Sequence, residues 1–80
     1  MPDKPQFAKG RKYRVRQDYS FLNHRFATGE IVTFTEEGYA PYDGVTRYWF
    51  EHAGSSGRDA WHVFDKESEK TDWTELFEPV

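Results

Sequence analysis

The sequence predicts an all-β domain, a small barrel of about five antiparallel strands with one short helical turn near the C-terminus. Three observations support this fold class. Aromatic residues make up 19% of the 80 residues, although hydrophobic residues of all kinds make up only 36%, and aromatic and β-branched side chains favour strands. Apolar and polar residues alternate over short segments. Turn-forming residues separate these segments, and no long helical pattern lies between them.

The length of the chain allows a single hydrophobic core. We expect residues 1–6 to be a disordered lead-in, because they contain two prolines and no apolar pattern, and residues 7–80 to form the domain. The chain has no cysteine, which excludes disulfides and thiolate metal sites. It has no signal-peptide pattern and no apolar stretch long enough to span a membrane, so we expect a cytoplasmic protein.

Charge is divided unevenly along the chain. Residues 1–30 have a net charge of +4 and residues 31–80 a net charge of −7, which together give the overall −3. This asymmetry indicates either two halves that attract each other within one fold or a basic contact patch on an acidic body. We favour the first interpretation.

The first predicted strand covers residues 12–17. Tyr13 and Val15 alternate with Lys12, Arg14 and Arg16, the pattern of a half-buried strand. We interpret this segment as an edge strand, which could pair with a second copy, although its three basic residues oppose this. Residues 18–25 lack a regular period and are interpreted as a long folded loop from which Phe21 and Phe26 reach the core.

The strongest strand signal is the β-branched run at residues 31–35, which follows a tight turn at Gly29-Glu30. Val32 and Phe34 lie on one face of this strand. The next segment, residues 36–44, has the composition of a loop, because Gly38, Pro41 and the pair Asp43-Gly44 each interrupt regular structure.

Two further strands are predicted at residues 46–52 and 58–64, joined by the short turn at residues 53–57. In the first, Tyr48 and Phe50 alternate with Arg47, Trp49 and Glu51, and we expect Tyr48 and Phe50 to meet Val32 and Phe34 in the core. In the second, Ala60, His62 and Phe64 alternate with Trp61 and Val63.

The C-terminal segment begins with a charged connector at residues 65–70. Asp72 followed by Glu75 is typical of a helix N-terminus, so we predict one helical turn there, limited by Pro79. A last strand at residues 73–78 is the alternative, since six residues do not define a period.

The spacing of several residues resembles the Src-homology-3-like barrels. The similar elements are Phe7-x-x-Gly10, Tyr13-x-Val15, Phe26-x-x-Gly29-Glu30 after a long loop, and a strand that contains Trp49. A second resemblance, over most of residues 7–64, is to a family of short bacterial proteins of uncharacterised function; it rests on Tyr13-x-Val15, Gly29-Glu30, Phe34, Pro41-Tyr42-Asp43 and Tyr48-x-Phe50.

The departures limit what this resemblance implies. Residues 15–19 are a poor match to the Ala-Leu-Tyr-Asp-Tyr motif of peptide-binding Src-homology-3 domains, a single Trp49 stands where a Trp pair would lie, and the Pro-Ser/Asn-Tyr segment is missing. The resemblance therefore implies the fold and not the binding of polyproline ligands.

No residue pattern indicates catalysis, a metal or a cofactor, so we predict a protein that is not an enzyme. His24, His52 and His62 are too few for a structural zinc site without cysteine. Ser55 and Ser56 lie near His52 in sequence but are explained as turn residues. The remaining candidates are carboxylates that we interpret as solvated loop residues: Glu36, Glu37, Asp65, Glu67 and Glu69.

The first functional hypothesis is a protein- or peptide-interaction module. Exposed aromatic residues are frequent anchors of interfaces, and we expect the anchors to be Tyr39, Tyr42 and Trp49, with Arg47 at the rim. Alternatively these rings fill the core; the same two possibilities apply to Trp61 and Trp73.

The second hypothesis is nucleic-acid binding through the basic N-terminal strand, where Tyr13 and Tyr19 are interleaved with cations. A sequence pI near 5.5 is lower than such proteins usually have. The candidate residues are Lys9, Arg11, Lys12, Arg14 and Arg16.

Overall fold

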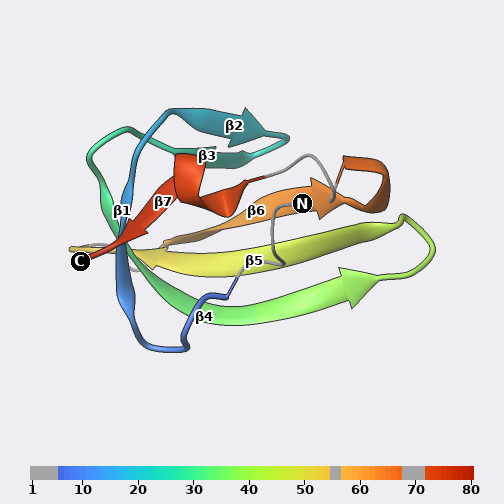
Figure 1. Ribbon diagram of the computed structural model, residues 1–80, viewed down its shortest axis with the longest axis horizontal. Coiled ribbons are helices and arrows are strands. Elements are labelled where there is room, and N and C mark those ends of the chain that lie inside the picture. Colours follow the sequence, from blue (N-terminus) through green and yellow to red (C-terminus); the bar gives the residue numbers. More distant parts are fainter. Residues whose placement is uncertain (1–5, 55–56, 68–71) are drawn as a thin grey trace.

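The computed structural model describes residues 6–54, 57–67 and 72–80, which form two antiparallel sheets (Figure 1). The larger sheet has the strand order β6–β5–β4–β1–β7, and the smaller is the hairpin β2–β3. Figure 1 shows β1 and β7 crossing the long strands β4, β5 and β6 at a steep angle, so the large sheet is bent over its own core. The strands are β1 (Lys12–Val15), β2 (Tyr19–Phe21), β3 (His24–Phe26), β4 (Ile31–Ala40), β5 (Val45–His52), β6 (Arg58–Phe64) and β7 (Phe77–Pro79).

The predicted all-β class is confirmed, since the described residues contain no helix beyond two single 3₁₀ turns, η1 (Asp65–Glu67) and η2 (Trp73–Glu75). No helix in the described ranges has the length and apolar character needed to cross a membrane. The two terminal strands in the sheet order, β6 and β7, are not paired with each other, so the sheet is not closed. Residues 1–5 of the predicted lead-in lie outside the described residues.

Strand β1 has the predicted alternation, with Tyr13 and Val15 buried and Lys12 and Arg14 exposed. It ends at Val15, two residues earlier than expected. It is paired on one side with β4 and on the other with β7, so the interpretation of this segment as an edge strand is wrong. The C-terminal strand covers the edge at which a second copy could have paired.

The segment predicted as a long loop contains the short hairpin β2–β3. Phe26 is buried in the core, as expected. Phe21 is only half-buried and contacts the rings of His62 and Phe64 at centroid distances of 4.8 and 5.6 Å. The hairpin therefore contributes one ring to the core and directs another over β6.

Strand β4 begins after the predicted turn, where Gly29 has a φ of +88°, a conformation that glycine adopts without the penalty of a Cβ. The strand continues through Ala40, with a bulge between Phe34 and Glu36. The prediction of a loop over residues 36–44 is thus wrong for its first half, and the turn is limited to residues 41–44. The ladder with β5 outweighs the weak strand propensity of Gly38.

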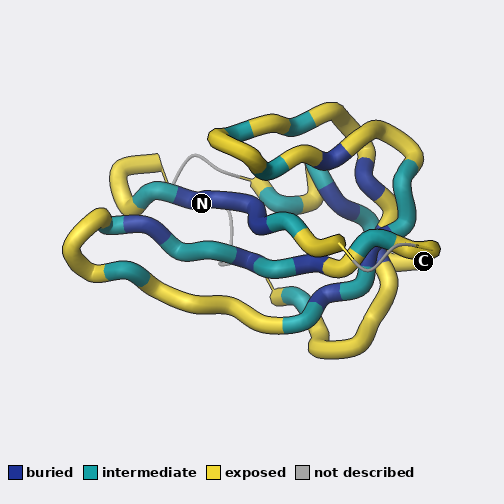
Figure 2. Tube along the Cα trace, turned by 180° about the vertical axis from the view of Figure 1, so that it is seen from behind, coloured by how far each residue is buried: buried dark blue, intermediate teal, exposed yellow. Residues whose placement is uncertain are grey.

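Strands β5 and β6 follow the predicted alternation, and Tyr48, Phe50, Trp61 and Val63 face the core. Strand β6 is buried on both faces, because hairpin β2–β3 packs along it. Figure 2 shows this contrast: β6 has a continuous buried stretch, whereas the second half of β4 is exposed.

The C-terminal segment contains both structures that the sequence left open. The predicted helical turn is η2, and Asp72 is its N-cap, with Oδ1 accepting a hydrogen bond from the Thr74 N–H at 3.0 Å. Two residues later Phe77 begins β7, which pairs with β1. Residues 68–70 of the charged connector lie outside the described residues.

One aromatic cluster forms the core. Val32, Phe34, Tyr48 and Phe50 all belong to it, as predicted. Phe50 has no exposed surface and stacks on Phe77 of the last strand, with ring centroids 4.6 Å apart. This stack joins the long strands to the C-terminus and fixes the bend of the sheet.

Candidate functional site

The face of β4, β5 and β6 that points away from the core carries several aromatic and cationic side chains. The register places Trp49 between Glu36 and Ala60, and Arg47 between Gly38 and His62. The tip of hairpin β2–β3 adds two rings. We call this surface the outer face; it consists of Phe21, His24, Glu36, Gly38, Arg47, Trp49, Arg58 and His62.

Trp49 is half-buried and held from two sides. The edge of its ring system meets His24, with ring centroids 5.4 Å apart and an interplanar angle of 80°. The Arg58 guanidinium lies over the ring, 4.9 Å from the centroid, and also pairs with Glu36 at 3.3 Å. A cation over an indole is attracted by the negative face of the ring, so Trp49 is oriented before any partner binds.

Arg47 lies beside Trp49 on the same strand and is half-buried. Its Nε–H donates to Nε2 of His62 at 3.3 Å. His62 is 8% exposed, and its Nδ1 lies 3.2 Å from the carbonyl oxygen of Ala60. Burial, together with nearby Arg47 and His24, lowers the pKa of His62. A neutral His62 therefore donates from Nδ1, accepts at Nε2 and orients the guanidinium.

The hairpin supplies partners for the backbone of β6. The hydroxyl of Tyr19 accepts a hydrogen bond from the His62 N–H at 3.1 Å, and Nδ1 of His24 accepts one from the Ala60 N–H at 3.1 Å. Nδ1 of His24 also lies 3.4 Å from Oδ1 of Asp59. Side chains of the hairpin thus cap the outer edge of the sheet.

His52 occupies a separate position at the core side of β5, between two carboxylates. Its Nε2 lies 2.5 Å from Asp59 Oδ2, and its Nδ1 contacts Glu30 Oε2. Burial lowers the pKa of His52, but the hydrogen bonds to Asp59 and Glu30 and their charges outweigh it, so the pKa is raised. Both ring nitrogens face carboxylates, which favours the imidazolium form.

In the described ranges, no group of three His, Cys, Asp or Glu side chains is arranged to hold a metal ion. Ser55 and Ser56 lie outside the described residues. The Glu30–His52–Asp59 arrangement joins the residue before β4 to the end of β5 and the beginning of β6, and its chemistry is that of a structural ion cluster.

The four residues predicted to bind a protein partner do not form one continuous surface. Trp49 and Arg47 share the outer face. Tyr39 lies on the opposite face of β4, where its hydroxyl donates to Asp65 Oδ2 at 2.7 Å and the pKa of Tyr39 is raised by that bond. Tyr42 is fully exposed in the β4–β5 turn, at 102%. Both tyrosines are accessible, whereas Trp61 is buried and Trp73 is half-buried.

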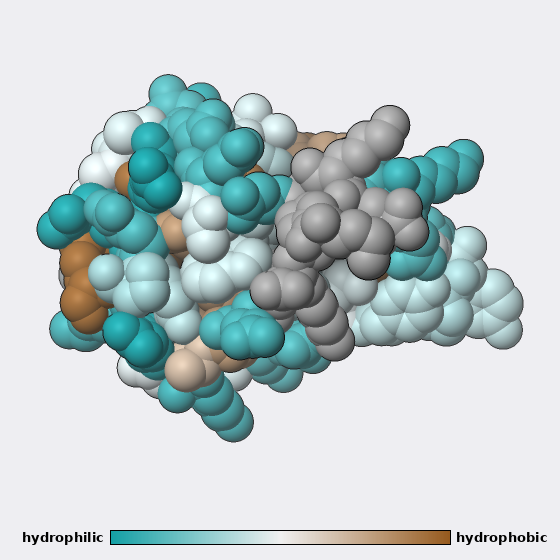
Figure 3. All heavy atoms as spheres, in the orientation of Figure 1, coloured by the Kyte–Doolittle hydropathy of each residue, from teal (hydrophilic) through white to brown (hydrophobic). Residues whose placement is uncertain are grey.

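The β4–β5 turn borders a pocket of about 480 Å³ against η1. Tyr42, Phe64 and Lys66 contribute to its lining. Figure 3 shows this end of the molecule projecting from the body, opposite the end at which a small hydrophobic area lies beside the C-terminus. Tyr42 is therefore a candidate second contact point, separate from the outer face.

The predicted nucleic-acid-binding residues are divided between structural and exposed roles. Arg14 pairs with Glu78 at 3.2 Å, and Arg16 donates from Nη1 to the carbonyl oxygen of Thr74 at 2.6 Å. Both bonds join the basic N-terminal segment to the acidic C-terminal one. Tyr13 is buried, so it offers no stacking surface. The remaining candidates are exposed: Lys9, Arg11 and Lys12.

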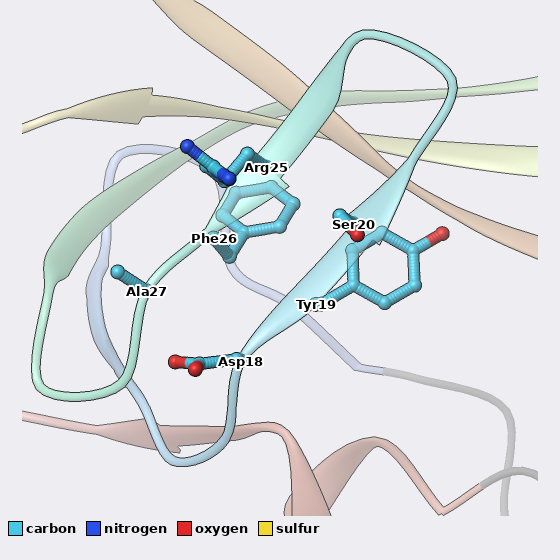
Figure 4. Close-up of a pocket in the computed structure, with 6 residues that line it drawn as sticks. All are labelled: Asp18, Tyr19, Ser20, Arg25, Phe26 and Ala27. Atoms are coloured by element: carbon cyan, nitrogen blue, oxygen red, sulfur yellow. The ribbon is translucent and has the colours of Figure 1, made fainter.

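A second pocket, of about 390 Å³, lies along the hairpin (Figure 4). The Asp18 carboxylate accepts bonds from both the N–H and the hydroxyl of Thr28, at 2.8 Å each, which lowers the pKa of Asp18. Figure 4 shows the Tyr19 hydroxyl pointing away from Asp18, where it meets β6. The Asp18 carboxylate therefore holds the loop, and the Tyr19 hydroxyl is bonded to β6.

Sequence reasoning identified Trp49 and Arg47 but missed the residues that surround them. Arg58 occupies the polar face of a predicted strand, so the strand register carried a signal for its place beside Trp49. Phe21 and His24 were missed because their segment was interpreted as a loop. The pairing of His52 with Glu30 had no signal, since the two residues are 22 positions apart.

Comparison with known proteins shows a likeness of fold. A solved structure from the mobile metagenome of Vibrio cholerae, an integron cassette protein, matches 92% of this chain and 88% of its own with a TM-score of 0.69. The sequence identity is 15%, so this likeness concerns the fold alone. No protein-family model matches the sequence, and the search of curated proteins gave no match.

Proposed function

We propose that this protein is a non-catalytic interaction module that binds a peptide or protein segment on its outer face. The observation that carries the proposal is Trp49, a half-buried indole held in place by His24 and Arg58. Trp and Arg are enriched among the residues that contribute most to interfaces, and a ring oriented in advance loses little entropy when a partner binds.

Tyr42 is proposed as a second contact at the β4–β5 turn, with Tyr39 behind it. A fully exposed tyrosine beside a pocket offers apolar area together with a hydrogen-bonding hydroxyl. A partner long enough to reach from Trp49 to the turn engages both sites. We also propose a cytoplasmic location, since a chain without cysteine needs no oxidising compartment.

We infer a Src-homology-3-like arrangement for this fold, related to that of short bacterial proteins. The strand order β6–β5–β4–β1–β7, the hairpin in the first long connection and the 3₁₀ turn before the last strand support it. The missing aromatic pair and Pro-Ser/Asn-Tyr segment argue against a polyproline groove, so the outer face is the favoured binding surface.

The proposal that the protein has no catalytic role rests on the hydrogen bonds that the histidines make within the fold. Both ring nitrogens of His52 face carboxylates, and His62 bonds to Arg47 and to Ala60. Each imidazole holds neighbouring elements together, which leaves it poorly placed to act as a general base toward a substrate.

Nucleic-acid binding is the alternative and has weaker support. Lys9, Arg11 and Lys12 are accessible, but the tyrosine between them and Arg14 is buried. Single-strand binding proteins combine cations with exposed rings on the same groove. The basic segment supplies the cations without those rings.

A selection from a displayed library of random 12-residue peptides tests the proposed function. We expect the wild-type protein to enrich a set of related peptides, and Trp49→Ala to bind them about 30-fold more weakly, the loss typical of an anchor residue. Val80→Ala removes another exposed apolar side chain, remote in sequence, and is the matched control. Circular dichroism shows whether each variant is folded.

Two outcomes would contradict the proposal. The first is a selection that enriches no related peptides. The second is a folded Trp49→Ala variant that retains wild-type affinity for the selected set. A single-stranded oligonucleotide tests the alternative, because binding to phosphates weakens steeply with salt, and Arg11→Gln should then reduce it while Trp49→Ala should not.

A further inference from the structure

Arg47 is a half-buried cation whose terminal nitrogens have no partner among the described residues. Its Nε–H is bonded to His62, but its two Nη atoms make no hydrogen bond or ion pair with any residue that the structure describes. Arginine removed from water is normally paired with a carboxylate or another acceptor. The Nη side of this guanidinium therefore remains able to donate to an acceptor.

Within the described ranges, Arg47 makes no ion pair with a carboxylate. His62 is neutral and therefore does not balance the positive charge of Arg47. Glu36, the acidic residue two positions before Gly38 on β4, is already paired with Arg58 at 3.3 Å. Glu51, two positions after Trp49 on the same face, is directly opposite Arg58 in the register. Neither carboxylate is a cross-strand neighbour of Arg47, whose partners in the register are Gly38 and His62.

Space for a ligand lies directly beside the guanidinium. Gly38 is the residue opposite Arg47 on β4, and a Cβ placed on it would meet no atom within 4 Å. The backbone conformation does not require glycine at this position, since the φ of Gly38 is not positive. A side chain there would stand beside Arg47, and its absence leaves the approach open.

We propose that Arg47 binds a carboxylate of an acidic peptide whose neighbouring apolar or aromatic residue contacts Trp49. This inference rests on the proposed function, because the same outer face binds both parts of the ligand. His62 is a positioning residue: by accepting from Nε it leaves both Nη donors available, and parallel N–H groups match the two oxygens of a carboxylate. The carboxylate belongs to an Asp or Glu side chain or to the peptide C-terminus.

A peptide carboxylate suits this site better than a nucleic-acid backbone. The outer face offers one unpaired guanidinium next to an indole, whereas a phosphate chain is bound by several cations in a row. The net charge of −3 also repels a polyanion more than it repels a single carboxylate.

The test uses the library of random 12-residue peptides, selected in parallel on wild type, Arg47→Gln and Arg11→Gln. We expect wild type to enrich peptides with Asp or Glu next to an apolar residue, or with a free C-terminal carboxylate if the library displays one. Arg47→Gln should lose this acidic preference while still selecting apolar peptides. Arg11→Gln makes the same charge change at an exposed residue outside the outer face and should select as wild type does.

A double-mutant cycle on one synthetic selected peptide then measures the coupling between Arg47 and the acidic residue of the peptide. Replacing the acidic residue of the peptide by its amide should weaken binding to wild type about tenfold or more, the lower end for close charge pairs at interfaces. The same replacement should not change binding to Arg47→Gln. Peptides with an amidated C-terminus distinguish a side-chain carboxylate from a terminal one.

The variant Gly38→Val provides a second measurement that does not alter charge. It fills the space beside Arg47 with a good strand-forming side chain, so the protein should fold while its affinity for the acidic peptide falls about tenfold or more.

The outcomes separate this inference from the proposed function. Selected peptides that depend on Trp49 but show no acidic preference overturn the carboxylate site and leave the interaction module in place. A selection that yields no related peptides overturns both. If Arg47→Gln and Arg11→Gln lose the acidic preference equally, the preference arises from the overall charge of the protein. That result also overturns the carboxylate site.

Discussion

At the scale of single residues, His52 illustrates how a side chain acts through its protonation state. Its two ring nitrogens lie against Glu30 and Asp59, and its pKa is raised. A histidine with a raised folded-state pKa stabilises the protein fully below its unfolded pKa, near 6.5, and loses that contribution as pH rises through the folded value. The titratable groups that face His52 are Glu30 and Asp59, and His24 lies next to Asp59.

We therefore predict that His52→Gln lowers the free energy of unfolding by about 1–3 kcal/mol near pH 6, the range for hydrogen bonds to charged groups. The difference from wild type should shrink as pH rises toward 9. Urea denaturation at a series of pH values measures it. His62 titrates in both proteins and cancels in the comparison. A difference that is constant with pH would show that His52 does not act through its charge.

At the scale of elements, the hairpin β2–β3 protects the edge strand β6. An edge strand presents unpaired N–H groups that invite pairing with other chains, and here Tyr19 and His24 accept from two of them. The same docking places Phe21 and His24 on the outer face. Edge protection and the candidate binding surface thus have a common structural origin.

We predict that Tyr19→Phe destabilises the protein by about 1 kcal/mol, since it removes one acceptor and leaves the His62 N–H unsatisfied. Amide hydrogen exchange should accelerate at His62 more than at residues of β1. The control Tyr42→Phe removes a hydroxyl from a fully exposed ring and should alter neither quantity. Unchanged protection of the His62 amide in Tyr19→Phe would contradict the role of the hydrogen bond.

At the scale of the whole molecule, stability depends on one aromatic cluster. Phe50 contacts rings from β4, from β7 and from the segment before β1, with centroids 4.6 to 5.4 Å away for Phe77, Phe7 and Phe34. The core of a chain this short has no second part to compensate for a loss. A cavity at this point therefore affects every element together.

We expect Phe50→Ala to cost about 3–5 kcal/mol, the usual range for truncating a buried Phe. This is a large part of the roughly 5–15 kcal/mol by which such domains are stable. Leu22→Ala, at a side chain that is 79% exposed, should change stability by less than about 0.5 kcal/mol. Thermal unfolding followed at several wavelengths gives both values. Comparable losses in the two variants would mean that the cluster is not the centre of stability.

The sequence was sufficient to predict the fold class, because the fold class depends on patterns within short segments of the chain. Alternation with period two identified the buried faces of β1 and β5, and Gly29 marked the turn before β4. The helical turn at η2 was predictable from its acidic N-cap. In each case a few consecutive residues determine which backbone conformation has the lowest free energy.

The sequence misled where local composition and long-range pairing disagree. Gly38 indicated a loop, but the ladder between β4 and β5 extends beyond it. Residues 18–25 indicated a loop, and contact with β6 organises part of them into a hairpin. Hydrogen bonds between distant strands outweigh propensities of less than about 1 kcal/mol per residue.

What the sequence alone determined is the alternating pattern that makes an aromatic all-β core, together with Trp49 and Arg47 as candidate binding residues. Only the tertiary structure decided that these two share a face with Phe21, His24 and Arg58, that Tyr39 lies on the opposite face, and that Arg47 retains free donors beside Gly38. The physical reason is that a surface joins residues from strands far apart in the chain, and their proximity depends on register and docking.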